Sequence, residues 1–472
     1  MFGIKVGIGN AGLKLAIHNH EFLCIVSPQL FPRKRFPHVG LCGKSKTLWK
    51  LLKTRSLNPK AFRKAQRRLQ PAIEAVFNES TGTTTITTIV IIKEGEEDTM
   101  KFTAIKDNLT SGLNIVQRAL SAKSVQPILS GIYLSARDGH LTMIATDTIE
   151  NAGLRIQCTV PVDVIEEGDT VVSGKSFRDF VTRLPDTTLV FENTSYNGQD
   201  RMTIRYDGND TEMIGWPGYD FPKPPKMDIL HCMSISQQTL SDLVRQTSFA
   251  ARKEDLRPIF TGLLFEVSGN DVTVVGTDSF RLAMMEEKIN NESGGEFHVV
   301  IPVRALAEVI GIVEEDAIIH ISITNSQILF ESGNVQITSQ LIKGEFPPYR
   351  AALPKSHTTH FDIDRSALRS SIDRATLFGR DNSGTTVIHL HVEGGKLTIK
   401  TASERGQVNE ALDIYMEGDE VNILFNANFL TDALTKMHYD ALDVEMSGDL
   451  GPCVFKPKND ERYLYLLLPL RQ

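Results

Sequence analysis

The chain has few cysteines and lacks any long hydrophobic run. Its 472 residues include five scattered cysteines, and no two of these form a C-x-x-C pair. A disulfide framework or a zinc site is therefore not expected, and this cysteine usage fits a reducing cytoplasm. No run of 18 apolar residues occurs, which excludes a membrane-spanning helix and a membrane partner. The length corresponds to about three domains.

Charge is distributed unevenly along the chain. Residues 1–99 contain 16 basic and 7 acidic residues, a net charge of +9, whereas the remaining residues carry −16. Residues 93–100 (KEGEEDTM) have purine-rich codons before a methionine, which resembles a bacterial ribosome-binding site. We hypothesise that Met100 is the true start and that residues 1–99 are a mis-called extension. The alternative is a basic, partly disordered arm that binds nucleic acid.

Beyond residue 99 the sequence repeats itself with a period of about 130 residues. Residues 127–132 (PILSGI) recur as 258–263 (PIFTGL), and residues 145–147 (ATD) recur as 276–278 (GTD), both with an offset of 131. A third, weaker copy places residues 401–404 (TASE) near the same position. A period this long indicates whole domains, each large enough to bury its own core.

Each copy shows the same succession of patterns. Apolar residues at helical spacing open every copy, alternating strand patterns with Gly, Asn and Asp turns follow, and a second helical pattern comes next. Proline-rich connectors separate the copies. We predict an α+β fold of three tandem homologous domains, each with two helices against antiparallel sheet. The predicted domains are residues 100–224, 228–348 and 354–472.

The six predicted helical segments are basic, although the body of the chain is acidic. Segments 105–123, 173–184, 236–253, 302–313, 364–380 and 426–438 contain 15 basic and 7 acidic residues, and the rest of the body carries −24. A shared positive surface would suit a polyanion such as DNA, which is bound through its phosphates without sequence preference. Helices that merely expose more Lys and Arg explain the charge about equally well.

No catalytic or metal-binding constellation can be assembled. Residues 173–176 (SGKS) lack the glycine spacing of a phosphate-binding loop. The repeated Thr-Asp dipeptides favour a structural turn, because the third copy has no Asp there. His389 and His391 share one strand face, but no third ligand is evident. We therefore predict no catalytic residues, no metal and no cofactor.

Several short motifs in fixed order resemble one known family. They are MKF at 100–102, PIL at 127–129, ATD at 145–147, GTDSFRLA at 276–283, GEFPPYR at 344–350 and LPLR at 468–471. Residues 100–472 are similar in these motifs to the bacterial sliding clamp, the beta subunit of DNA polymerase III. The resemblance implies a non-catalytic processivity factor, a head-to-tail homodimer that closes as a ring around double-stranded DNA. Rival interpretations are a non-circular DNA-binding scaffold and a multi-domain nucleic-acid-modifying enzyme.

The resemblance also implies partners and sites. The partners would be double-stranded DNA, a second copy of the chain, the replicative polymerase, the clamp loader, and repair and translesion polymerases that carry short linear motifs. DNA contact is predicted for Lys123, Arg178, Arg183, Arg245, Arg252, Lys253 and Arg257.

A pocket for partner peptides is implied between the second and third domains. Its predicted residues are Phe260, Thr277, Ser279, Phe280, Arg281, Leu282, Pro347, Pro452, Leu466, Leu468, Pro469 and Leu470. Phe280, Ala351 and Ala352 depart from the family pattern in side-chain size or polarity. The implied dimer interface joins Leu377 and Phe378 of the third domain to Thr211 and Met213 of the first.

Overall fold

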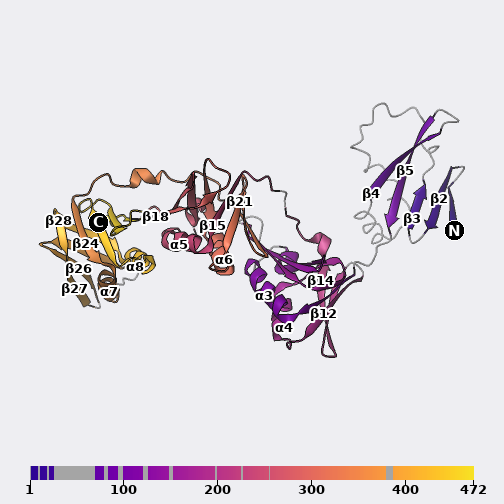
Figure 1. Cartoon of the computed structure of the whole chain (residues 1–472), viewed down its shortest axis with the longest axis horizontal. Coiled ribbons are helices and arrows are strands. Elements are labelled where there is room, and N and C mark those ends of the chain that lie inside the picture. Colours follow the sequence, from indigo (N-terminus) through magenta and orange to yellow (C-terminus); the bar gives the residue numbers. More distant parts are fainter. Residues whose placement is uncertain are drawn as a thin grey trace. The chain divides into compact units, whose positions relative to one another are not determined.

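The chain divides into two compact units, Met1–Thr99 and Met100–Gln472. A computed structural model describes residues 99–120, 126–147, 153–196, 199–224, 227–254, 256–378, 386–404 and 406–471, and the backbone of five earlier strands. These strands are β1 (Phe2–Ile8), β2 (Ala11–His18), β3 (Glu21–Ile25), β4 (Gln70–Asn78) and β5 (Thr83–Lys93) (Figure 1). They form one antiparallel sheet in the order β1-β2-β3-β5-β4. The hypothesis of a mis-called or disordered extension stays a prediction.

The second unit contains three domains with one order of elements. In its described residues each domain has nine strands and two α-helices. The first comprises β6 (Met100–Ile105), α3 (Lys106–Val116), β7 (Gly131–Arg137), β8 (His140–Thr146), β9 (Arg155–Pro161), β10 (Asp163–Glu166), β11 (Gly168–Ser173), α4 (Gly174–Arg183), β12 (Thr188–Tyr196), β13 (Gln199–Tyr206) and β14 (Asn209–Pro217).

The second and third domains repeat this order. The second comprises β15 (His231–Ser236), α5 (Gln237–Thr247), β16 (Gly262–Ser268), β17 (Asp271–Thr277), β18 (Arg281–Lys288), β19 (Asn290–Asn291), β20 (Glu296–Pro302), α6 (Val303–Ile312), β21 (Ile318–Ile323), β22 (Gln327–Ser332) and β23 (Val335–Gln340). The third comprises β24 (Thr359–Asp364), α7 (Arg365–Thr376), β25 (Val387–Glu393), β26 (Lys396–Ser403), β27 (Gly406–Asp413), β28 (Tyr415–Gly418), β29 (Val421–Asn426), α8 (Ala427–Lys436), β30 (Ala441–Met446), β31 (Cys453–Pro457) and β32 (Tyr463–Leu467). The predicted three α+β domains with two helices each are confirmed.

Each helix buries one apolar stripe against its own sheets. Leu109, Leu113 and Val116 of α3 are fully buried, and the buried Leu240 and Val244 of α5 occupy the places of Leu109 and Leu113. Burying one such side chain contributes about 1.5–3 kcal/mol to stability. The two helices of a domain pack side by side, as α7 and α8 do (Figure 1). None of the helices in the described part of the chain is both long and apolar enough to traverse a bilayer.

The first helix of each domain is shorter than predicted. Segments 105–123, 236–253 and 364–380 end their α-helices at Val116, Thr247 and Thr376. A 3-10 turn follows the first two helices. The end of α5 is set by tertiary packing, because a Cβ at Gly276 would lie 2.4 Å from the carbonyl oxygen of Thr247. Propensity along the helix carries no information about this close approach.

Strands also pair across the domain boundaries. β9 of the first domain pairs antiparallel with β23 of the second, with Ile156 opposite Ile337. β18 of the second domain pairs in the same way with β32 of the third, with Leu282 opposite Leu466. The predicted proline-rich connectors are bonded to neighbouring strands, and in the first of them the Pro222 carbonyl accepts a hydrogen bond of 3.0 Å from Arg155 of β9. In the second connector, the buried Tyr349 donates a hydrogen bond of 2.6 Å to Glu266, which fixes the connector to β16.

Candidate functional site

A tight turn between β17 and β18 presents several predicted pocket residues. The Asp278 carboxylate accepts hydrogen bonds from the amides of Phe280 (2.9 Å) and Arg281 (3.0 Å). Ser279 adopts a left-handed backbone, with φ of 78°, and the Thr277 hydroxyl donates to the Arg281 carbonyl at 2.7 Å. Short polar side chains that bond their own backbone favour such turns. The Thr-Asp dipeptide here has the structural role predicted for it.

The turn and the C-terminal segment together form an apolar strip at the second domain junction. The pairing of Leu282 with Leu466 gives the strip its buried floor, because these side chains are only 4% and 3% exposed. The amide of Leu468 donates to the Phe280 carbonyl at 2.9 Å. Phe280 and Leu468 remain 55% and 39% exposed. Two adjacent apolar side chains at a junction mark a surface that can receive another apolar group.

The other predicted pocket residues surround this strip to different degrees. Phe260 is buried at the base of β16, beneath the guanidinium of Arg257. Pro452 directly precedes Cys453 of β31, and Cys453 pairs with Leu467, the last residue of β32. Pro452 therefore lies at the same end of this strand pair as Leu468, which follows β32. The carbonyl of Pro347 accepts from the amide of Tyr349 in the connector. Pro469 and Leu470 are half-buried, and the amide of Leu470 donates to the Leu424 carbonyl.

Arg281 alone among the predicted pocket residues points a charge into the junction. Its guanidinium donates to Asp278 at 3.0 Å and to Asp432 of α8 at 2.8 Å, and lies 4.3 Å from the ring centre of Phe429. Burial lowers the pKa of this guanidinium, but the hydrogen bond to Asp432 and the nearby carboxylates outweigh it and raise the pKa overall. Arg281 therefore ties the second domain to the third.

Of the cations predicted to contact DNA, Arg178 lies in the middle of α4, and Arg183 and Arg245 lie in the last turns of α4 and α5. Each of these three has a partner within the chain. Arg178 of α4 forms an ion pair of 2.7 Å with Asp179, and Arg183 donates to the Asp179 carbonyl at 2.6 Å. Arg245 of α5 hydrogen-bonds the ring of His438 at 3.2 Å. These contacts are exposed and of the kind that a phosphate can displace.

Three further predicted cations lie in the loop after α5 rather than on the helix. Arg252 donates to the Asp278 carbonyl at 2.9 Å and lies 5.9 Å from the Phe280 ring centre, which attaches it to the strip. Lys253 and Arg257 are exposed in the same loop. Lys123, the predicted cation at the corresponding sequence position of the first domain, lies outside the described residues. The described basic positions are thus divided between helices α4 and α5 and the loop after α5.

The predicted interface residues belong to the first and third domains, two on a strand and two after a helix. Thr211 and Met213 belong to β14, whose residues 209–214 pair only with β13 in the described part of the chain. Leu377 and Phe378 follow α7 and are 71% and 39% exposed. Phe378 packs beside Gly406 at the start of β27, and β27 pairs only with β26 in that part of the chain.

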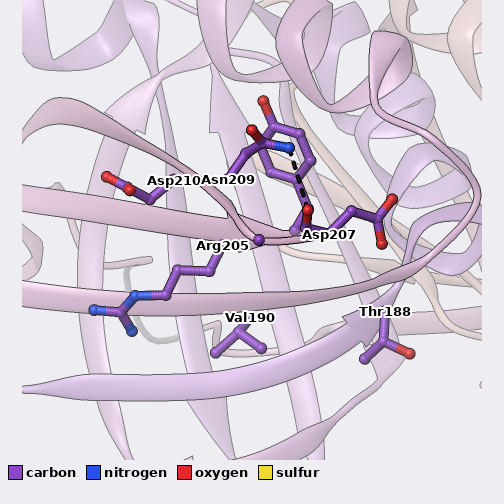
Figure 2. A pocket seen from close by; sticks show the side chains of 8 residues that line it. Thr188, Val190, Arg205, Asp207, Asn209 and Asp210 are labelled. Atoms are coloured by element: carbon purple, nitrogen blue, oxygen red, sulfur yellow. Dashed lines mark hydrogen bonds between the residues drawn. The ribbon is translucent and has the colours of Figure 1, made fainter.

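An open hollow of about 350 Å³ lies elsewhere, in the first domain. Its walls come from β12 and from the turn between β13 and β14, where Asn209 donates weakly to the Asp207 carbonyl at 3.4 Å (Figure 2). Arg205 on its rim already pairs with Glu192 at 2.5 Å. None of the predicted pocket residues lines this hollow, so its position does not support a role in peptide binding.

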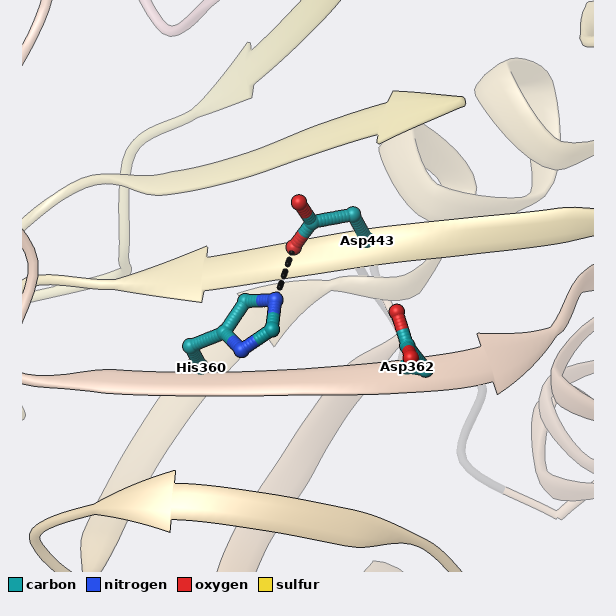
Figure 3. A group of neighbouring side chains, drawn as sticks. All are labelled: His360, Asp362 and Asp443. Carbon is teal, nitrogen blue, oxygen red and sulfur yellow. Dashed lines mark ion pairs between the residues drawn. The ribbon is translucent and has the colours of Figure 1, made fainter. Parts of the chain in front are cut away.

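Two histidine–carboxylate clusters occur among the described residues of the third domain. His360 lies 2.7 Å from Asp443, and Asp362 lies beside them on β24 (Figure 3). Asp362 also forms an ion pair of 2.5 Å with Lys458, so this cluster has its own cation. In the second cluster His391 lies near Glu393 and Glu420, two carboxylates that sequence reasoning did not connect with it. Glu393 could have been recognised, because it lies two residues after His391 on the same strand.

Sequence reasoning missed the ion pairs that join the first two domains. Arg118, in the 3-10 turn after α3, contacts Glu308 of α6 at 3.1 Å. Arg304 of α6 reaches back to Asp147 in the first domain. An alignment of the second helices of the three domains would have drawn attention to Glu308, because Asp179 and Asp432 occupy the same helix position.

Comparison with known proteins matches all three domains to one family. Family models describe the N-terminal, central and C-terminal domains of the DNA polymerase III beta subunit, and they match residues 100–224, 234–348 and 350–471. A beta sliding clamp of Staphylococcus aureus is 30% identical over 381 residues, which cover 79% of this chain and 99% of the relative. One from Staphylococcus epidermidis is 29% identical over 383 residues, with the same coverage.

A solved structure shows the same fold. The DNA polymerase sliding clamp of Bacillus subtilis superposes with a TM-score of 0.74 at 29% identity, over 79% of this chain and 99% of that protein. The fold of the three-domain unit therefore has a counterpart in a solved sliding clamp. The chain belongs to the bacterial beta sliding clamp family, the DNA sliding clamps that form the beta subunit of DNA polymerase III.

Proposed function

We propose that two copies of this clamp join head to tail and close around double-stranded DNA. The main observation is that, among the described residues, the first and last domains each have an unpaired strand edge, and that these two strands are equivalent to the strands that pair at the internal junctions. At each internal junction, the strand after the first hairpin of one domain (β9 or β18) pairs with the last strand of the next domain (β23 or β32). The equivalent strands with open edges are β27 and β14, which belong to opposite ends of the array. Head-to-tail contacts of this kind generate rings when they close.

The helix ends support the same pairing. Leu377 is nine residues beyond Leu368, the residue equivalent to Leu109 and Leu240, so it corresponds to Arg118 and Phe249. Both counterparts contact the next domain: Arg118 forms an ion pair with Glu308, and the Phe249 ring lies 5.5 Å from that of Tyr465. An exposed leucine at this position fits a surface that a second copy covers.

The internal junctions also suggest a register. Ile156 pairs with Ile337 at the first junction, and the equivalent residues of the next two domains pair with each other at the second junction. Val408 of β27 occupies the position of Ile156, because each pairs with the equivalent residue of the preceding strand. Thr211 occupies the position of Ile337, because each is the third residue after a two-residue hairpin turn. The closing pair is therefore Thr211 opposite Val408.

DNA would be retained by topology rather than by tight binding. A closed ring needs only weak, sequence-independent phosphate contacts in its lining, because the duplex cannot leave sideways. The exposed cations at helix ends and loops, among them Arg183, Arg245, Lys253 and Arg257, are suited to such contacts. In this role the chain has no catalysis of its own and works in the cytoplasm at the nucleoid.

The apolar strip would receive the linear motifs of partner proteins. Phe280 and Leu468 offer an exposed apolar rim over a buried floor, an arrangement that suits a short anchor peptide. The replicative polymerase, the clamp loader, and repair and translesion polymerases would compete for it. Each protomer would thus tether one partner at a time through this strip.

A disulfide across the closing pair tests ring and register together. Thr211→Cys with Val408→Cys, in a background in which Cys24, Cys42 and Cys232 are replaced by Ser, should yield a covalent dimer on oxidation. Asn409→Cys in place of Val408→Cys is the control, since adjacent strand residues face opposite sides. The oxidised dimer should stay on nicked circular DNA and leave the same DNA once it is linearised. Equal retention on both forms would refute encirclement.

A further inference from the structure

The second helix of every domain carries an acidic residue at the same position. Phe177, Leu306 and Leu430 are the equivalent buried residues of α4, α6 and α8. Two residues after each of them comes an acid, and these acids are Asp179, Glu308 and Asp432. The common position gives all three carboxylates one orientation relative to the core of their domains.

Two of these acids bind an arginine from the preceding domain. Glu308 contacts Arg118 at 3.1 Å across the first junction, and Asp432 contacts Arg281 at 2.8 Å across the second. The two arginines come from different elements, a 3-10 turn and a strand. The position of the acid is therefore the same at both junctions, whereas the arginine that binds it comes from a different element in each case.

Asp179 has no preceding clamp domain in its own chain. It pairs instead with Arg178, the residue next to it, at 2.7 Å, and its side chain is 31% exposed. Sequence neighbours on a helix do not face each other, and an exposed pair contributes at most about 1 kcal/mol. This pair is thus a contact that a better-placed cation can displace.

We propose that Asp179 binds Arg374 of a second copy and so forms the ion pair of the closing junction. This inference rests on the head-to-tail ring proposed above. Arg374 lies on the last turn of α7, three residues before Leu377 and on the same helix face. Its guanidinium holds both carboxylate oxygens of Glu410, at 2.6 and 2.5 Å, and Glu410 belongs to β27, the strand that carries the open edge. The Arg374 side chain is 56% exposed and can turn from Glu410 toward an incoming carboxylate.

Closure would then release Arg178. Once Asp179 binds the partner copy's cation, the guanidinium of Arg178 loses its nearest carboxylate and becomes available to a phosphate. Ring closure and one of the predicted DNA contacts are therefore coupled through Asp179. The coupling predicts that neutralising Asp179 weakens the dimer without weakening DNA contact by the open chain.

A charge-swap series in the full chain tests the inference. Asp179→Lys should raise the dimer dissociation constant about tenfold or more in sedimentation, because two cations then meet at the junction. Adding Arg374→Glu should restore most of the loss. Glu166→Lys, an exposed acid on β10 with the same change in charge, is the control and should leave the dimer unchanged.

Each other outcome has a definite meaning. An Asp179→Lys dimer as tight as the wild type would overturn the inference and leave the ring untouched. A weakened dimer that Arg374→Glu does not restore would overturn the assignment of Arg374. A wild-type chain that is monomeric in the same experiment would overturn the proposed ring itself.

Discussion

Arg118 and Arg281 make equivalent contacts at the two junctions inside the chain, but their surroundings differ. The Arg118 side chain is 43% exposed, and a second ion pair, between Arg304 and Asp147, lies at the same junction. The Arg281 side chain is 9% exposed and lies among two carboxylates and the rings of Phe249 and Phe429. The backbone pairing is alike at both junctions, so strand pairing sets the geometry and the side chains set the strength.

The difference has an electrostatic cause. Exposed ion pairs contribute about 0–1 kcal/mol because water and salt screen them, whereas removing one member of a buried pair costs about 3–5 kcal/mol. The second junction also borders the apolar strip, since the turn that carries Phe280 contains Arg281. A rigid second junction would hold this strip in one shape. The proposed junction between two copies, which contains the exposed Leu377 and Phe378, would be the third junction. We expect it to open more easily than the two junctions inside the chain.

The largest effect is expected at the closing junction. Leu377→Lys should convert the dimer to monomers, because it places a charge in an apolar contact. We expect the dissociation constant to rise by about a hundredfold or more, measured by sedimentation or native mass. Leu450→Lys is the matched control, since Leu450 is 75% exposed against 71% for Leu377 but lies in a turn of the third domain far from β27 in sequence. If both variants have the same dimer dissociation constant, Leu377 does not lie in the closing junction.

The next largest effect separates the two internal junctions directly. Arg281→Ala leaves the buried Asp278 carboxylate without its cation and should lower the free energy of unfolding by about 3 kcal/mol. Arg118→Ala removes the equivalent contact at the first junction and should cost less than about 1 kcal/mol. Urea titration of both variants measures the difference. Similar losses in the two variants would show that burial does not distinguish the junctions.

A smaller effect concerns the strip beside the second junction. Leu468→Lys should weaken binding of a synthetic peptide with the polymerase's clamp-binding motif by about tenfold, because the rim loses an apolar contact. Fluorescence anisotropy measures the affinity, and Leu450→Lys again serves as the control. The same dimer mass in both variants would show that the loss is local. Unchanged affinity in Leu468→Lys would place the peptide elsewhere.

The features read correctly from the sequence are those encoded locally. The stripe that begins at Leu109 and the hairpin turn at residues 268–271 follow from helical spacing and turn chemistry over a few residues. The three-domain array followed from the repeat. The resemblance named the pocket and interface residues, and their roles stay predictions.

What the sequence did not reveal depends on contacts between distant segments. The end of α5 depends on Gly276, which lies 29 residues further on, and the inward direction of Arg281 depends on Asp432 in another domain. Neither relation leaves a periodic trace. The acid at Asp179 can be recognised from the sequence, because an acid recurs at this position when the second helices are aligned. Its role at a junction could be inferred only from the contacts that Glu308 and Asp432 make in the structure.

The smallest effect is a pH dependence confined to the second junction. Arg462 donates to Asp460 at 2.9 Å and to Glu287 of β18 at 2.7 Å, which links the third domain to the second. The hydrogen bond from Arg462 lowers the pKa of Asp460 below its ordinary value. A carboxylate with a lowered folded pKa stabilises the protein above its unfolded pKa of about 3.9, and this contribution is lost as the pH falls through the folded value.

Asp460→Asn should therefore flatten the acid limb of the stability curve below about pH 4 and cost less than about 1 kcal/mol at pH 7, since the side chain borders solvent. Urea titrations at a series of pH values would measure both effects. If Asp460→Asn leaves the acid limb unchanged, this ion pair does not distinguish the second junction, and the strength of that junction must come from the packing around Arg281.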